Sequence, residues 1–316
     1  MEAEDTAILR KPVAVPGMAW AAVGVLAFSG TVPATVLALR GMDAFVVGAG
    51  RSVLAALLAG SALLATRAPR PRPHQWAGLL LVAAGCGIGF GALSAIALRD
   101  VTASHAAVII GLLPIATAVA ARVRGGERAT WVFWASSAGG AVVVVTFAAS
   151  ESAGSLHAAD LLLLLALAVG AIGYAEGGRL ARELPGWQVI AWGLVLALPV
   201  SLPLTAATLA HTTIHPGITS LGGLAYVSAV SMFLGFFAWF HGLGEAGIAR
   251  ASQLQLVQPF LTVAWSALLL GERPGITTFV AAALVFGCVA ASQQARFSKS
   301  EMTRVTAHRV GHNQAA

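Results

Sequence analysis

The sequence predicts an all-α integral membrane protein with ten transmembrane helices, arranged as two inverted repeats of five helices. The first observation is composition: of 316 residues, 58% are hydrophobic and only 10% are charged, whereas soluble domains carry about 25% charged residues. The second is that apolar runs long enough to cross a bilayer recur along the whole chain. The third is an internal repeat, which sets the number and orientation of the spans.

The repeat relates residues 98–128 to residues 243–273 by a constant shift of 145 positions, without a gap. The shift places Pro114 against Pro259, and the Gly-Glu-Arg that begins at Gly126 against the one that begins at Gly271. Each repeat unit contains five spans, so the second half is expected to be inverted relative to the first. Inverted repeats are a recurring architecture of secondary transporters, whose substrate site lies near the midplane between the halves.

The expected organisation is a cytoplasmic tail (1–12), a first repeat (13–148), an external linker (149–160), a second repeat (161–292) and a basic cytoplasmic tail (293–316). The first apolar run is longer than the roughly 7–15 residues of a signal-peptide core, so we expect it to be retained. The expected spans are 13–39, 44–65, 76–98, 102–121, 130–148, 161–177, 189–209, 221–240, 248–270 and 276–291.

Basic residues predict the orientation. With the N-terminus in the cytoplasm, all but four of the 19 Lys and Arg residues fall inside; Arg40, Arg99 and Arg273 fall outside, and Arg51 lies within a span. Cytoplasmic loops carry such an excess, so both termini are expected in the cytoplasm. The bias towards alanine, glycine and arginine is typical of high-GC bacteria, which favours the plasma (inner) membrane. Because the arginines lie in short connectors, we expect no nucleic-acid partner despite the net charge of +6.

Two five-span halves, each with a proline-containing fourth span that ends in Gly-Glu, resemble the drug/metabolite transporter superfamily and, within it, the EamA-type family. Arg51, in the stretch GAGRSVLAALLAG, is similar to an arginine common in that family. The resemblance covers about residues 17–292. It implies a carrier that alternates between inward-open and outward-open states and usually exports amino acids or other small metabolites. The position that matches Arg51 in the second half holds Leu196, so any arginine role belongs to one half.

Span nine carries a polar stripe. On a helix these side chains share one face, which cannot comfortably lie against lipid. The stripe is expected either to line the substrate pathway or to supply hydrogen bonds between helices. Pro259, within the stripe, and its counterpart Pro114 are expected to act as hinges or in packing. The stripe consists of Ser252, Gln255, Gln258, Thr262 and Ser266.

Glu176 lies deep in span six, where an ionisable group is a functional candidate. It is expected either to exchange a proton or contact a substrate ammonium, or to form a local pair with Arg179 three residues on. His105, near the outer end of span four, is expected to be a satisfied structural residue, with a gating role as the alternative.

Arg51 is expected to reach outward or to pair with Asp43 or Asp100 in the outer connectors, with a substrate carboxylate as the alternative. Gly126 and Gly271 are expected helix C-caps. Small-residue spacings in spans three and six, such as Gly85/Gly89 and Gly173/Gly177, indicate close helix packing.

No catalytic motif is present, and the connectors are too short for a catalytic domain, so we expect no enzyme. Cys86 and Cys288 both fall in apolar runs, and no cofactor or metal site is expected. The sequence therefore predicts a secondary-active or facilitative transporter, whose partners are a small-molecule substrate and the lipid bilayer. Protons as the coupling ion and a homodimer are left open. The alternatives are a non-transporting scaffold or receptor, and an intramembrane enzyme.

Overall fold

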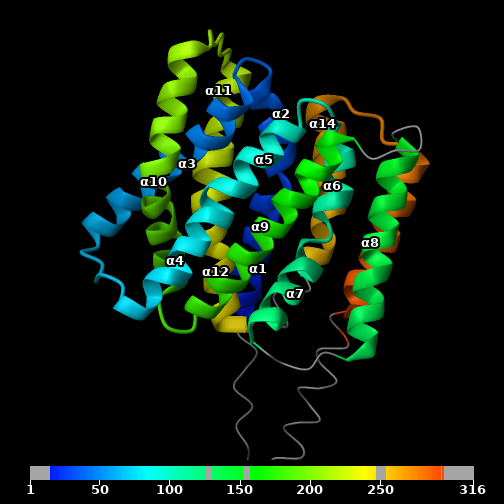
Figure 1. The fold of residues 1–316 in the computed structure, drawn as a ribbon, viewed down its shortest axis with the longest axis horizontal. Coiled ribbons are helices and arrows are strands. Elements are labelled where there is room, and N and C mark those ends of the chain that lie inside the picture. The colour runs from blue at the N-terminus through cyan, green and yellow to red at the C-terminus, as the bar shows by residue number, and fades with distance from the viewer. Residues whose placement is uncertain (1–14, 126–129, 152–156, 247–253, 293, 295–316) are drawn as a thin grey trace, which may run out of the picture.

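The computed structural model describes residues 15–125, 130–151, 157–246, 254–292 and 294. Within these ranges all regular structure is helical (Figure 1). Eight helical stretches are long and apolar enough to cross a membrane, and two shorter apolar helices follow, Gln255–Leu270 and Ile276–Ser292. The eight stretches coincide with the first eight predicted spans, which confirms a multi-pass helical membrane protein. The start of the ninth predicted span lies outside the described residues, and ten spans remain a prediction.

The first half contains, in chain order, α1 (Val15–Ser29), α2 (Thr31–Leu39), α3 (Ala44–Ala65), the 3-10 turn η1 (Pro73–Gln75), α4 (Trp76–Val82), the π-helix η2 (Ala83–Gly89), α5 (Phe90–Ala97), α6 (Ala103–Ile110), α7 (Leu113–Gly125) and α8 (Trp131–Glu151). The second half contains α9 (Ala158–Leu180), α10 (Gly186–His211), α11 (Ile218–Ala225), the π-helix η3 (Tyr226–Gly235), α12 (Phe236–Ala246), the 3-10 turn η4 (Gln255–Val257), α14 (Gln258–Leu270) and the helix Ile276–Ser292.

Several apolar stretches are interrupted in mid-course. Gly30 separates α1 from α2, and Gly111 and Leu112 separate α6 from α7. The π-helices η2 and η3 interrupt the third and eighth stretches, and the turn η4 precedes α14. Irregular backbone at membrane depth is tolerated where it is buried in protein or lines a cavity. A cavity is therefore expected where these interruptions meet.

The two predicted prolines do not kink a continuous helix. Pro114 is the second residue of α7, and Pro259 is the second residue of α14. Proline suits the first helical turn, because the N–H that it lacks would have no helical partner there. Each proline therefore restarts a helix immediately after an interruption. Gly271 occupies the predicted C-cap of α14 with a left-handed φ of 71°, whereas Gly126 lies outside the described residues.

Helices of the first half pack mainly on helices of the second. Helix α1 lies against α12, α3 against α10, α5 against α9, and α6 against α14. In Figure 1, α8 runs beside the orange-red C-terminal helix at one edge of the bundle, and Gly139 and Gly140 of α8 face Cys288 there. The interior between the two halves is thus enclosed by pairs of helices that come one from each half.

The crossing of α9 and η2 depends on glycine, as the small-residue spacing predicts. A Cβ atom on Gly173 would lie 2.7 Å from Cys86 Sγ and 2.9 Å from the backbone nitrogen of Cys86. Gly178, five residues further along α9, has no atom of the described residues within 4 Å of the corresponding position. The two glycines therefore form a matched pair for testing the crossing.

We expect Gly173→Ala to lower the free energy of unfolding by about 1–3 kcal/mol, because the methyl group overpacks the crossing. Gly178→Ala is expected to raise it by up to about 1 kcal/mol, since alanine favours the helix and meets no neighbour there. Thermal melts of the purified protein in detergent check both. Equal melting temperatures for the two variants would contradict this description of the crossing.

Candidate functional site

The interruptions meet around a central cavity between the halves. Its empty space is about 520 Å³, open solvent included. Breaks or π-turns of the first, third, fourth and eighth stretches all contribute to its wall, together with α3, α9 and α14. The lining residues are Phe28, Thr31, Val32, Arg51, Cys86, Phe90, Ile110, Leu113, Tyr174, Ser231, Met232, Phe236 and Gln258.

Arg51 is the charged side chain of this cavity. It is only 3% exposed, so it does not reach outward to the membrane surface. The expected pairing with Asp43 or Asp100 is also wrong: Asp43 caps α3 by accepting the amide of Phe45 at 2.8 Å, and Asp100 is exposed. Among the described residues, Arg51 Nε and Nη1 have no hydrogen-bond partner. The guanidinium carbon lies 6.0 Å from the centre of the Phe90 ring.

Aromatic rings form much of the remaining wall. The Phe28 and Phe236 ring centres lie 4.9 Å apart, and those of Tyr174 and Phe236 lie 5.1 Å apart. Two hydroxyls bridge the halves beside them, because Thr31 Oγ1 and Ser231 Oγ are 2.6 Å apart. Such a wall offers large apolar surfaces with a few polar groups, as is common for small-molecule sites.

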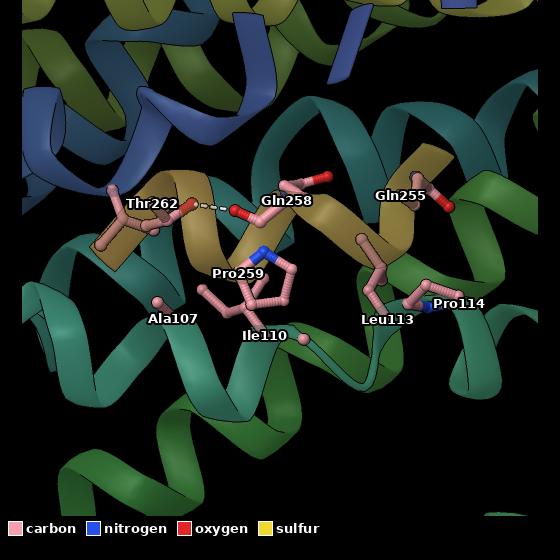
Figure 2. Close-up of a pocket in the computed structure, with 10 residues that line it drawn as sticks. Ala107, Ile110, Leu113, Pro114, Gln255, Gln258, Pro259 and Thr262 are labelled. Carbon is pink, nitrogen blue, oxygen red and sulfur yellow. Dashed lines mark hydrogen bonds between the residues drawn. The ribbon is translucent and has the colours of Figure 1, made fainter. Parts of the chain in front are cut away.

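A second cavity adjoins the first. It holds about 340 Å³ of empty space, open solvent included, and shares Val32, Ile110, Leu113 and Gln258 with the first. Figure 2 shows Gln255 and Gln258 along one side and Pro259 of α14 above Ile110 of α6. The lining residues are Val32, Ala107, Ile110, Gly111, Leu113, Pro114, Gln255, Gln258, Pro259 and Thr262. The interruptions of the fourth and ninth stretches therefore face each other.

The predicted stripe divides into two groups. Gln255 and Gln258 line cavities. Thr262 also lines the second cavity, but its hydroxyl, like that of Ser266, forms hydrogen bonds within the bundle. Thr262 Oγ1 donates to the Ser29 carbonyl oxygen at 2.9 Å and to the Gln258 carbonyl oxygen at 3.0 Å, a contact drawn in Figure 2. Ser266 Oγ donates to the carbonyl oxygen of Thr262. Ser252 lies outside the described residues.

Glu272 joins the end of α14 to the start of α6, at the side of the bundle expected to face outward. Its carboxylate accepts the amides of Ala103 at 2.8 Å and Ser104 at 2.9 Å, and the Ser104 hydroxyl at 2.5 Å. A negative charge at a helix N-terminus is favourable, because unpaired amides and the helix dipole both point to it. This contact between the two halves was not predicted from the sequence.

His105 is part of a buried pair, as expected of a satisfied structural residue. Its Nε2 lies 2.7 Å from Asp160 Oδ1, and the two side chains are 8% and 0% exposed. The other carboxylate oxygen of Asp160 accepts the amide of His157 at 3.0 Å, which caps the start of α9. Asp160 was missed because it was assigned to the external linker, 149–160, one residue before the sixth expected span.

Glu176 lies at the other side of the bundle and lines neither cavity. Arg179 Nε donates to Glu176 Oε2 at 3.1 Å, so the local pair is present. Arg179 also donates to Glu183, which accepts further hydrogen bonds from Gln75 and His74. The bonds from Gln75 and His74, with the charge of Arg179, hold the pKa of Glu183 below its usual value. The carboxylate of Glu183 therefore stays charged at neutral pH.

Comparison with known proteins identifies the family. The model of the EamA-like transporter family matches the chain twice, over residues 15–148 and 157–292. The chain belongs to the EamA-like transporter family. It is therefore a membrane transporter, and the drug/metabolite transporter superfamily inferred from the sequence follows. Membership of a transporter family, which is generally non-enzymatic, agrees with the absence of a catalytic motif in the sequence.

Individual relatives agree with the EamA-like assignment. An uncharacterized transporter of Bacillus subtilis, YdeK, is 44% identical over 277 residues, which cover 88% of this chain and 96% of the relative. A probable terminal-alkyne amino-acid exporter of Streptantibioticus cattleyicolor is 26% identical over 188 residues, 58% of this chain and 62% of the relative. A solved structure described as "Crystal structure of protein" has a TM-score of 0.62 at 17% identity, over 89% of this chain and 97% of its own, which shows a common fold.

Proposed function

We propose that this EamA-like protein is a secondary carrier that exports small metabolites by alternating access, with the central cavity as its substrate site. The observation that carries the proposal is the cavity itself. Its wall is built from both halves of the chain and from the interrupted parts of several helices. Transporters place substrates at such interruptions near the membrane midplane.

The positions of the interruptions support two inverted repeats, of residues 13–148 and 161–292. The shift of 145 residues carries η2 onto residues 228–234, within η3, and carries Gly111 and Leu112 onto residues 256–257, within η4. Helix packing follows the same relation, because the contact of α1 with α12 corresponds to that of α9 with the third stretch. An odd number of spans in each half would invert the second half and place both termini in the cytoplasm.

Export of amino acids or related compounds, which share a carboxylate, is supported by the family and by the name of one distant relative, the probable terminal-alkyne amino-acid exporter. Gln255 and Gln258 offer neutral amides that would hydrogen-bond such molecules. We propose that Pro114 and Pro259 serve as hinges, because each restarts a helix at the facing interruptions. The plasma membrane follows as the location of an exporter.

Flux measurements in proteoliposomes test the proposal. A panel of labelled amino acids, organic acids and neutral metabolites is offered with and without an imposed pH gradient. We expect flux of one compound class, reduced by up to about tenfold by Gln258→Ala, since one lost hydrogen bond to a bound substrate is worth up to about 1.5 kcal/mol. Gln294→Ala, the same change at an exposed position, is the control. Correctly inserted protein without flux of any compound would contradict the carrier and favour a scaffold.

Glu176→Gln tests proton coupling in the same vesicles. Because Glu176 pairs with Arg179 and lines neither cavity, we expect flux and its pH dependence to stay unchanged. The free energy of unfolding should fall by about 1 kcal/mol with the loss of the pair. Loss of the gradient effect in the variant would instead make Glu176 the proton-exchanging group.

A further inference from the structure

We propose that Arg51 binds a carboxylate of the transported molecule, so that the substrates are small organic acids with an uncharged, apolar body. This inference rests on the proposed function, because it takes the central cavity as the substrate site and names the chemical class that fits it. Three features of the cavity carry the argument: an unpaired guanidinium, a space kept open for it, and a wall rich in aromatic rings whose described residues include no acidic side chain.

The unpaired guanidinium is the first feature. A buried charge is costly unless it is paired, and arginine in a membrane interior usually pairs with a carboxylate or carbonyl. Arg51 Nε and Nη1 have no such partner among the described residues, although both lie in a side chain that is 97% buried. The planar donors of a guanidinium match a carboxylate in a two-point contact. A substrate carboxylate would supply the missing partner.

The second feature is the space around the guanidinium. Gly91 of α5 faces it so closely that a Cβ there would lie 2.5 Å from both Nε and Nη2 of Arg51. Any larger residue would push the guanidinium from its present position. The close fit of α5 against α3 therefore keeps the guanidinium of Arg51 at the cavity wall.

The third feature is the rest of the wall. Phe28, Phe90, Tyr174 and Phe236 surround the space, and no Asp or Glu lines either of the two described cavities. Thr31 and Ser231 already bond to each other. A substrate ammonium would find no carboxylate here, whereas a hydrocarbon or aromatic body would lie against rings. The wall thus favours a singly charged anion over a zwitterion.

Ligand-dependent thermal stability tests binding without relying on transport, because a ligand that binds the folded protein raises its melting temperature. The full chain in detergent is titrated with 3-phenylpropionate and isovalerate, with their primary amides and with phenylalanine. We expect the two acids to raise the melting temperature, the amides to leave it unchanged, and phenylalanine to bind more weakly than 3-phenylpropionate.

Substitutions then locate the effect. Arg51→Gln is expected to weaken acid binding about 10- to 100-fold, the range for a lost hydrogen-bonded charge, with Arg51→Lys in between. Arg99→Gln, the same change at an exposed arginine, should bind as the parent chain does. Gly91→Ala keeps the arginine but displaces it, and should weaken binding too. If Arg51→Gln does not fold, Gly91→Ala and the comparison of acids with amides still test whether Arg51 binds a carboxylate.

Equal stabilisation by acids and amides, or undiminished acid binding by Arg51→Gln, would overturn the proposal. Tighter binding of phenylalanine than of 3-phenylpropionate would contradict the inference that the body of the substrate is uncharged. The flux panel separates the two levels of inference. Flux of neutral compounds without acid binding would leave the carrier standing and remove the role of Arg51. Acid binding without flux of any compound would support the role of Arg51 and contradict the carrier.

Discussion

Asp160→Ala is expected to lower the free energy of unfolding by about 3 kcal/mol, because it leaves buried His105 without its partner. The substitution also removes the carboxylate oxygen that accepts the amide of His157 at the start of α9. Equilibrium unfolding in mixed micelles with a denaturing detergent measures the change. A double-mutant cycle with His105→Ala should give a coupling energy above about 1 kcal/mol, as neighbouring residues in one hydrogen-bonded pair do.

Asp100→Asn is the control for this cycle. Asp100 is exposed in the connector before α6, and its substitution should change stability by less than about 0.5 kcal/mol. Strict additivity of Asp160→Ala and His105→Ala would contradict the pair. It would mean that the 2.7 Å contact between the two side chains contributes nothing beyond the packing of each.

Glu272→Ala is expected to open the side of the protein where α14 meets α6. The carboxylate holds two backbone amides and one hydroxyl, and hydrogen bonds to a charged group contribute about 1.5–3 kcal/mol. Loss of about 1.4 kcal/mol alone shifts an equilibrium tenfold.

In a chain whose native cysteines are replaced by serine, an Ala107→Cys substitution places a thiol in the cavity wall. An impermeant reagent added from outside should modify it about tenfold faster after Glu272→Ala, in line with that shift.

Two further substitutions make the accessibility assay specific. Glu272→Gln keeps an acceptor oxygen and should increase the rate less than alanine does, because the charge is lost but one hydrogen bond stays possible. Arg273→Gln changes the exposed neighbour and should leave the rate unchanged. An unchanged rate in Glu272→Ala would show that the contact between α14 and α6 does not hold this side closed.

Local composition was enough to predict the membrane-spanning helices, because the bilayer requires each span to be apolar along its own length. The Gly173 packing position and the Gly271 cap were also predicted locally, from small-residue spacing and from a C-terminal glycine signal. The pairing of Glu176 with Arg179 followed from a spacing of three residues. These features share one property: the residues that determine them are close in sequence.

Contacts between distant residues were not predicted. Glu272 contacts Ser104 at a separation of 168 positions, and nothing in the Gly-Glu-Arg stretch distinguishes a membrane anchor from a cap on another helix. For Arg51 the nearby acidic residues suggested a partner, but Asp43 already caps its own helix. The π-helices were not predicted. The glycines of η2 were interpreted only as a packing surface, since the extra hydrogen-bond length of a π-helix depends on what the surrounding helices enclose.

The π-helix η2 has a consequence for variation in chain length. Its backbone bonds span one residue more than those of an α-helix, so a single-residue deletion within Ala83–Gly89 would let an uninterrupted α-helix form. Because a π-turn holds about one residue more than an α-turn, the helix beyond the deletion would keep nearly its present orientation. Gly91 would therefore still face the Arg51 guanidinium. Relatives that lack one residue within this segment should retain the same cavity wall.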